Sequence, residues 1–208
     1  MSTSADAGAW RRLAVAGHGG DEATAREAMS SDDPVARELA LGALSRLGAL
    51  TADDLHTASS DPHHSVRRRA AVLIAVRTDV TLLPLLHDAD DRVVDTAAWA
   101  AGEQQPLRDT VDDEVVTRLI TLATESGEPL VRESAIAALG AIGDPRGLPA
   151  ILAGCDDKPA VRRRAVLALA PFDGPEVQAA LDAALEDRDW QVRQSAEDVA
   201  PFMRPDDD

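Results

Sequence analysis

The chain has 208 residues, of which 45% are apolar and only 2% aromatic, and its 37 acidic and 21 basic side chains give a formal net charge of −16. The apolar fraction excludes a disordered chain, and the lack of any apolar run of about 18 residues predicts that no segment spans a bilayer. The acidic excess disfavours nucleic acid and anionic membranes as partners, although local basic patches can override it.

Two features of the chain favour a cytoplasmic location. Cys155 is the only cysteine, so it has no partner for an internal disulfide and fits a reducing compartment. The opening residues, MSTSADAGAW, lack the basic and apolar regions of a secretory signal. We therefore expect a cytoplasmic protein without disulfides.

The first predicted element is a helix over about residues 4–17, around Trp10, which would cap the elements that follow. Beyond it the same arrangement of apolar residues recurs until near the end of the chain. The predicted organisation is a capping segment over residues 1–19, a repeat region over 20–203 and an acidic tail over 204–208.

Six copies of one pattern occupy the repeat region, at a spacing of about 30 residues. Each copy has an anchor residue, an Ala four positions later, and apolar residues seven and eight positions on. The anchors are Ala36, Val66, Val93, Val131, Val161 and Val192. Offsets of 0, 4, 7 and 8 lie on one face of an α-helix, and the constant Ala predicts a close crossing between helices.

Another helix is predicted before each anchor, because apolar residues recur eleven and eight positions upstream, again on one helical face. Polar turns separate the two helices. Their Asp and Ser side chains can cap the second helix, and Pro suits its first turn. Each copy is therefore predicted to be a helical hairpin that buries its apolar face only by stacking on its neighbours.

The pattern Asp-turn-Val-Arg-x-x-Ala-x-x-Ala-Leu resembles the HEAT-like repeat family, in the short form described in phycobilisome lyases. The match is closest in the segments VRESAIAALGAIGD (131–144) and VRRRAVLALA (161–170). The resemblance covers about residues 20–203 and implies an all-α, right-handed superhelix (solenoid) of about six helical hairpins. It also implies that the second helices line a concave surface, and it indicates little about function.

An Arg follows the anchor in five of the six copies, and Val94 replaces it in the third. The five are Arg37, Arg67, Arg132, Arg162 and Arg193. A residue that recurs at one position of a repeat usually serves the repeat itself. The resemblance implies that these arginines form a structural ladder of hydrogen bonds with Asp residues in the turns of neighbouring repeats.

The positions two, three and six residues after the anchor differ among the copies, as a surface that reads a partner would. From these positions we predict a partner-binding set on the concave face: Arg68, Arg69, Asp95, Trp99, Glu133, Arg163 and Arg164. The alternative is a solvated face with ordinary ion pairs between repeats.

Trp99 differs from its equivalents, since no other copy has an aromatic residue at that position. An exposed Trp is a common binding anchor. Alternatively, Trp99 fills a gap beside Ala100 and Ala101. Trp190, in contrast, is expected to pack against the last turn.

Together these observations predict a non-catalytic scaffold or adaptor that binds a protein or peptide on its concave face, with no metal or cofactor. An enzyme is the alternative class, because some HEAT-like proteins are DNA glycosylases or bilin lyases. Arg68, Asp95 and Trp99 faintly resemble the residues that the glycosylases use, but the net charge of −16 argues against nucleic acid. No His-Glu dipeptide of the kind found in HEAT-repeat di-iron hydroxylases occurs in the sequence.

One insertion interrupts the regular spacing. The third and fourth anchors are further apart than the others, and the extra residues lie mostly in QQPLRDTVDD (104–113). Long loops in compact repeats are often functional, but insertions in surface loops are also tolerated. Both interpretations stay open.

Overall fold

The computed structural model describes residues 4–19, 21–104 and 112–203, and these residues form thirteen α-helices, one short 3-10 helix and no strand. The helices are α1 (Ser4–Gly19), α2 (Glu22–Ala28), α3 (Pro34–Arg46), α4 (Ala52–Ser59), α5 (His64–Ile74), α6 (Leu83–Leu86), α7 (Asp91–Gln104), α8 (Asp113–Glu125), α9 (Pro129–Ile142), η2 (Pro145–Gly147), α10 (Leu148–Gly154), α11 (Pro159–Ala168), α12 (Pro175–Leu185) and α13 (Trp190–Met203). This is the expected all-α solenoid.

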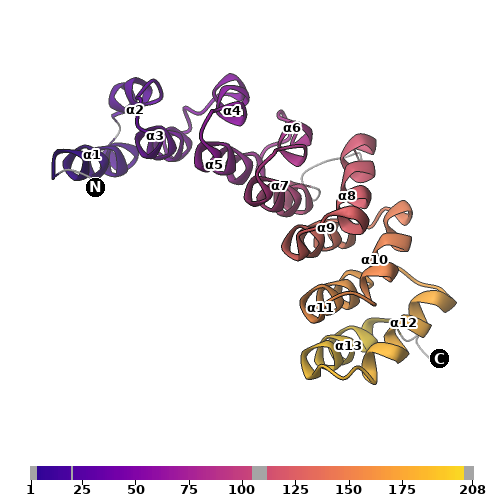
Figure 1. Cartoon of the computed structure of the whole chain (residues 1–208). Helices are drawn as coiled ribbons and strands as arrows, with labels where there is room; N and C mark the ends of the chain where they lie inside the picture. The colour runs from indigo at the N-terminus through magenta and orange to yellow at the C-terminus, as the bar shows by residue number, and fades with distance from the viewer. Residues whose placement is uncertain (1–3, 20, 105–111, 204–208) are drawn as a thin grey trace.

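From α2 onward the helices pair into six hairpins, α2–α3 to α12–α13, that stack into an arc (Figure 1). The odd-numbered helices, which are the second helices of the hairpins, lie along the inner side of the arc. The even-numbered helices lie along the outer side. Helix α1 packs on α2 and α3 at the N-terminal end. The residues predicted to contact a partner all lie on inner helices.

Local sequence signals set where the inner helices begin. Asp33 accepts a hydrogen bond from the backbone N–H of Val35 and so caps α3, while Pro34 occupies its first turn. Pro129 and Pro159 take the same place in α9 and α11. Gly143 caps the C-terminal end of α9, and its φ of +69° lies in the left-handed region that glycine adopts without a steric penalty.

The constant alanines of the six copies explain how closely the hairpins stack. Each of them is 0% exposed: Ala40, Ala70, Ala97, Ala135, Ala165 and Ala196. A larger side chain at this position would push neighbouring helices apart. The contact is closest between α9 and α11, where a β-carbon on Gly140 would lie 2.7 Å from the Cα of Ala168. Every hairpin contributes to one main core layer, and Ala25, Ala43 and Leu44 of the first hairpin form a smaller separate cluster.

The third hairpin departs from the pattern, because its first helix, α6, has only four residues. Pro84 lies in the first turn of α6, and its ring and missing N–H oppose a helix that extends further upstream. The segment before it still contributes Val80 and Leu82 to the core. The regular spacing of apolar residues is thus kept in the segment before α6, although that segment is not helical.

No helix in the described part of the chain combines the length and apolar character needed to cross a bilayer.

Candidate functional site

Four of the five recurrent arginines bind an Asp in the turn of the following hairpin, and we call these pairs the Arg–Asp ladder. The pairs are Arg37–Asp61, Arg67–Asp88, Arg132–Asp157 and Arg162–Asp187. In the first pair, Nε and Nη2 each donate to a different carboxylate oxygen, both at 2.7 Å. Nη1 of Arg37 donates to the carbonyl of Ser31, in the turn of its own hairpin, at 2.7 Å. Each ladder arginine therefore ties two successive turns together.

The ladder holds its carboxylates in the charged form. Hydrogen bonds from Arg132 lower the pKa of Asp157 below its ordinary value, and those from Arg162 do the same for Asp187. Partial burial opposes the shift in both cases and is outweighed. The bidentate geometry and low exposure mark the ladder as structural, since its groups are already satisfied by one another.

The ladder is interrupted at one junction, between the third and fourth hairpins, and both members are missing there. Val94 lies on α7 where the other copies have Arg, and the turn before α9 begins with Ser126 and contains no Asp. A cavity of about 260 Å³ lies at this junction, lined in part by Val94 and Ser126. The two hairpins are joined instead by a hydrogen bond of 2.5 Å from Ser134 Oγ to Asp95 Oδ1 and by one of 3.1 Å from Arg118 Nε to the carbonyl of Leu86.

The fifth arginine, Arg193, lies on α13, in the last hairpin that the structure describes. Its Nη1 donates to the carbonyl of Asp187 at 2.7 Å, as the others do within their own hairpins. In the described residues it makes no ion pair. Within the described residues it therefore makes the contact to the turn of its own hairpin alone.

Several of the predicted partner-binding residues contact one another across neighbouring hairpins. Glu133 on α9 lies between two arginines of α11, with its Oε1 3.9 Å from Arg163 Nη2 and 3.7 Å from Arg164 Nη2. Arg163 also donates to Gln191 on α13 at 3.3 Å. This part of the inner face therefore carries the ion pairs between repeats that the alternative interpretation expects.

Arg68 and Arg69 on α5 differ from these residues. Among the described residues, no carboxylate lies within the 4.0 Å of an ion pair from either guanidinium. Arg68 is exposed and Arg69 is half-buried. The inner face thus carries positive charge that the ladder and the cross-repeat pairs leave without a carboxylate partner.

Trp99 on α7 is 44% exposed, while the neighbouring Ala100 and Ala101 are buried. Much of the indole is therefore available at the middle of the arc. The expectation for Trp190 is wrong: its side chain is 65% exposed at the start of α13 and does not pack against the turn. Its position at a helix N-terminus places it outside the apolar offsets of the repeat, which is why no core position receives it.

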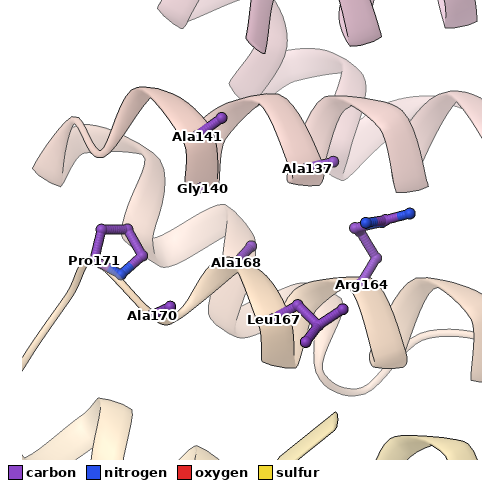
Figure 2. A pocket seen from close by; sticks show the side chains of 8 residues that line it. All are labelled: Ala137, Gly140, Ala141, Arg164, Leu167, Ala168, Ala170 and Pro171. Atoms are coloured by element: carbon purple, nitrogen blue, oxygen red, sulfur yellow. The ribbon is translucent and has the colours of Figure 1, made fainter. Parts of the chain in front are cut away.

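A shallow groove of about 510 Å³ lies between α9 and α11, and the sequence patterns did not predict it (Figure 2). It is lined by Ala137, Gly140, Ala141, Arg164, Leu167, Ala168, Ala170 and Pro171. In Figure 2 the Arg164 side chain rises from α11 toward α9 at one end of the groove. Ala137 and Leu167 are the repeat equivalents of Trp99, so the groove continues the line of Trp99 along the inner face. Its lining residues other than Arg164, Leu167 and Pro171 are Gly and Ala, and these small residues were its only sequence signal.

The insertion at 104–113 falls largely outside the described residues, because residues 105–111 are not among them. At its edges, buried Gln104 donates to the carbonyls of Arg77 and Val80, the latter at 3.1 Å, and Asp112 caps α8. The acidic tail, 204–208, also lies outside the described residues.

Two further observations concern covalent and metal chemistry. Burial raises the pKa of the Cys155 thiol to about 11, so at neutral pH it is protonated and weakly nucleophilic. Within the residues that the structure describes, no group of three or more His, Cys, Asp or Glu side chains is placed to hold a metal ion.

Comparison with known proteins gives a family and similar solved structures. A family model described as HEAT repeats matches residues 78–158 and again 116–200. The structure of human deoxyhypusine hydroxylase in complex with glycerol is similar over 93% of this chain and 77% of that one, with 19% sequence identity and a TM-score of 0.48. No curated protein matches the chain.

Proposed function

This chain belongs to the HEAT repeat family, and on that premise we propose that it is a non-catalytic scaffold or adaptor which binds a protein or peptide segment along the inner face of its arc. The observation that carries the proposal is Trp99, 44% exposed at the middle of that face. Exposing an indole to water is unfavourable unless a partner covers it, and Trp residues are enriched among the residues that dominate binding energy.

In the proposed mechanism the partner binds to a preorganised surface. The Arg–Asp ladder fixes successive turns, and the buried alanines fix the spacing of the hairpins, so little conformational freedom is lost on binding. Trp99 would contact an apolar side chain of the partner. The groove between α9 and α11, on the same line, would receive a second one.

Basic side chains lie on both sides of Trp99 along the inner face, and they favour a negatively charged partner. Arg68 and Arg69 precede it on α5, and Arg163 and Arg164 follow it on α11. On a chain with a net charge of −16, these residues are where an acidic segment could bind without repulsion. Glu133 already shares the C-terminal pair, so the N-terminal pair would contribute more. A cytoplasmic location forms part of the proposal and is supported by the single cysteine.

The test is affinity capture from native lysate with three purified baits: the wild type, Trp99→Ala and Trp190→Ala. Trp190→Ala is the matched control, because it also removes an exposed indole but lies outside the inner-face offsets. Each protein that the wild type recovers is then purified and its Kd is measured directly. We expect at least tenfold weaker binding for Trp99→Ala and a change below twofold for Trp190→Ala, with equal melting temperatures.

Equal recovery and equal Kd values for the Trp99→Ala and Trp190→Ala baits would contradict binding at the inner face. Turnover of any recovered small molecule or nucleic acid by the wild type, lost in Trp99→Ala, would instead support the enzyme class.

A further inference from the structure

The position six residues after the anchor gives the inner face an apolar strip. Four successive inner helices carry an apolar residue there, and none of these residues is fully buried: Val72 on α5, Trp99 on α7, Ala137 on α9 and Leu167 on α11. The first and last copies differ, with Gly42 on α3 and Asp198 on α13. The apolar strip therefore crosses the middle of the arc and stops before the last hairpin.

The apolar strip runs across the inner helices, because each helix contributes one residue to it. Helices α5, α7, α9 and α11 each pack on the next, and packed helices lie about 8–10 Å apart. In an α-helix, residues seven apart lie on nearly the same face and are separated by about 10.5 Å along the axis. A helix that lies along the strip would therefore present one apolar residue to each inner helix if its apolar residues recur every seven positions.

Opposite charges lie on the two sides of the apolar strip, measured along the inner helices. Arg69 and Arg164 lie three residues before Val72 and Leu167, and Glu103 lies four residues after Trp99. At a rise of about 1.5 Å per residue, the basic and acidic levels are about 10 Å apart, close to the diameter of an α-helix with its side chains. Glu103 is exposed, and no cation of the described residues forms an ion pair with it.

Two carboxylates also lie on the basic side of the strip, but both have contacts within the chain. Asp95 accepts the hydrogen bond from Ser134, and Glu133 lies within 3.9 Å of two arginines of α11. Helix α5 adds two further arginines on this side, so four guanidinium groups there exceed two carboxylates. The side before the strip is therefore positive, and the side after Trp99 is negative.

The apolar strip suits a helical partner better than an extended one. Its residues lie within helices, whose backbone N–H and C=O groups point along the helix axes and not toward the inner face. An extended segment would therefore bury part of its own backbone polar groups without partners, which is unfavourable. A helix satisfies these groups internally, so only its side chains need to match the surface.

We propose that the apolar strip binds an amphipathic α-helix of a protein partner, which lies across the inner helices with apolar residues every seven positions. Its acidic side faces Arg69 and Arg164, and its basic side faces Glu103. The inference rests on the proposed function and specifies the form of the partner. Because the two sides of the strip differ in charge, they also fix the direction in which the helix lies. The groove between α9 and α11 receives one of its apolar residues.

The test measures fluorescence anisotropy of two fluorescein-labelled probe peptides of 22 residues. The heptad probe has Leu at three positions seven residues apart, Glu on one side of the Leu positions, Lys on the other and Ala elsewhere. The proline probe differs only by Pro at two central Ala positions, so it keeps every Leu and every charge but forms no continuous helix. We expect the heptad probe to bind at least tenfold more tightly than the proline probe.

Variants locate the heptad probe on the protein. Leu167→Gln should weaken its binding at least fivefold, whereas the matched control Leu130→Gln, which changes an exposed Leu outside the strip, should change Kd by less than twofold. Leu167 also packs against the core, so the melting temperature of each variant is measured in parallel. Ala137→Gln adds a side chain to the groove without removing an apolar contact, and it should weaken the probe to a similar extent.

Charge on the acidic side is tested separately. Glu103→Lys should weaken the heptad probe at least threefold at low salt, and the difference should shrink at high salt, where such interactions are screened. Glu27→Lys is the matched control, because it makes the same change of charge at an exposed position of the outer helix α2. Equal Kd values for these two variants would overturn the assignment of a basic residue to this side.

Equal affinities of the heptad and proline probes would overturn the helical partner. Equal affinities of Leu167→Gln, Ala137→Gln and Leu130→Gln would overturn its place on the apolar strip. A natural partner whose binding depends on Trp99, found together with either result, would leave the proposed function standing. Strip-dependent binding of the heptad probe, found together with equal Kd values for the Trp99→Ala and Trp190→Ala baits, would overturn the proposed function alone.

Discussion

Arg132 on α9 donates to both carboxylate oxygens of Asp157, at 2.6 and 2.7 Å, and through this pair the turn before α9 is tied to the turn before α11. A third donor of the same guanidinium binds the carbonyl of Ser126 at 2.8 Å. The pair is mostly withdrawn from solvent. Its loss would remove both guanidinium donors from the carboxylate, which would keep only the backbone N–H of Lys158, and the guanidinium donor from the carbonyl.

We therefore expect Arg132→Ala to lower the free energy of unfolding by about 2 kcal/mol, because a partly buried carboxylate loses its charge partner. Urea denaturation followed by circular dichroism measures the change. Arg193→Ala is the matched control: it removes the same residue from the same repeat position, but Arg193 makes no ion pair with a described Asp, and the expected loss is below about 1 kcal/mol. Equal losses in the two variants would show that the pairing of Arg132 with Asp157 does not contribute to stability.

The interrupted junction offers the reverse experiment. Val94 is almost fully buried, so Val94→Arg alone should destabilise the chain by about 1–3 kcal/mol. Ser126→Asp alone should be nearly neutral. In the double variant the new residues can pair within the 260 Å³ cavity, and we expect a favourable coupling of at least about 1 kcal/mol. A double-mutant cycle measures it, and strictly additive effects would show that the cavity does not accommodate the pair.

The pH dependence of stability should follow the ladder. The folded-state pKa of Asp157 is below its unfolded value of about 3.9, so the unfolded chain binds protons first as pH falls. The stability that the pair contributes is complete above that pH and is lost as pH falls through the lowered pKa. The stability difference between the wild type and Arg132→Ala should therefore be constant from pH 8 to 5 and shrink below about pH 4. A difference that stays constant to pH 2 would contradict the pairing.

Two glycine substitutions should have opposite effects. A β-carbon on Gly140 would lie 2.7 Å from the backbone Cα of Ala168, so Gly140→Ala must move α9 away from α11 and should cost about 1–3 kcal/mol. A β-carbon on Gly42 meets only the ends of two flexible side chains, and Gly42→Ala should stabilise the chain by up to about 1 kcal/mol. Thermal melting of the two variants side by side gives the signs. Stabilisation by both substitutions would show that the contact between α9 and α11 can accommodate a methyl group at Gly140.

The fold could be predicted from the sequence because its determinants recur. The offset-four alanines are identical in six copies, and burial at one hairpin implies burial at the others, as their exposures of 0% show. The short helix α6 could not be foreseen in the same way, since the apolar spacing around Leu82 persists although Pro84 prevents a longer helix.

The candidate site could be predicted only in part. Variation among the copies pointed to Trp99 and to the basic pairs, but it did not show that Glu133 lies between Arg163 and Arg164 while Arg69 lies over Gly42. Those relations depend on distances of a few ångströms between side chains of neighbouring hairpins. A pattern of residue types along one chain does not contain them.

The ladder pairs join residues that are 21 to 25 positions apart in the chain, and in each pair the Arg precedes the Asp. During synthesis, a hairpin that has left the ribosome can therefore form its ladder pair once the next turn emerges. Contacts of such short sequence separation favour rapid folding, hairpin by hairpin from the N-terminus. At Val94 this sequential locking has no counterpart, so the growing chain would pass that junction on packing and on the Ser134–Asp95 and Arg118–Leu86 hydrogen bonds.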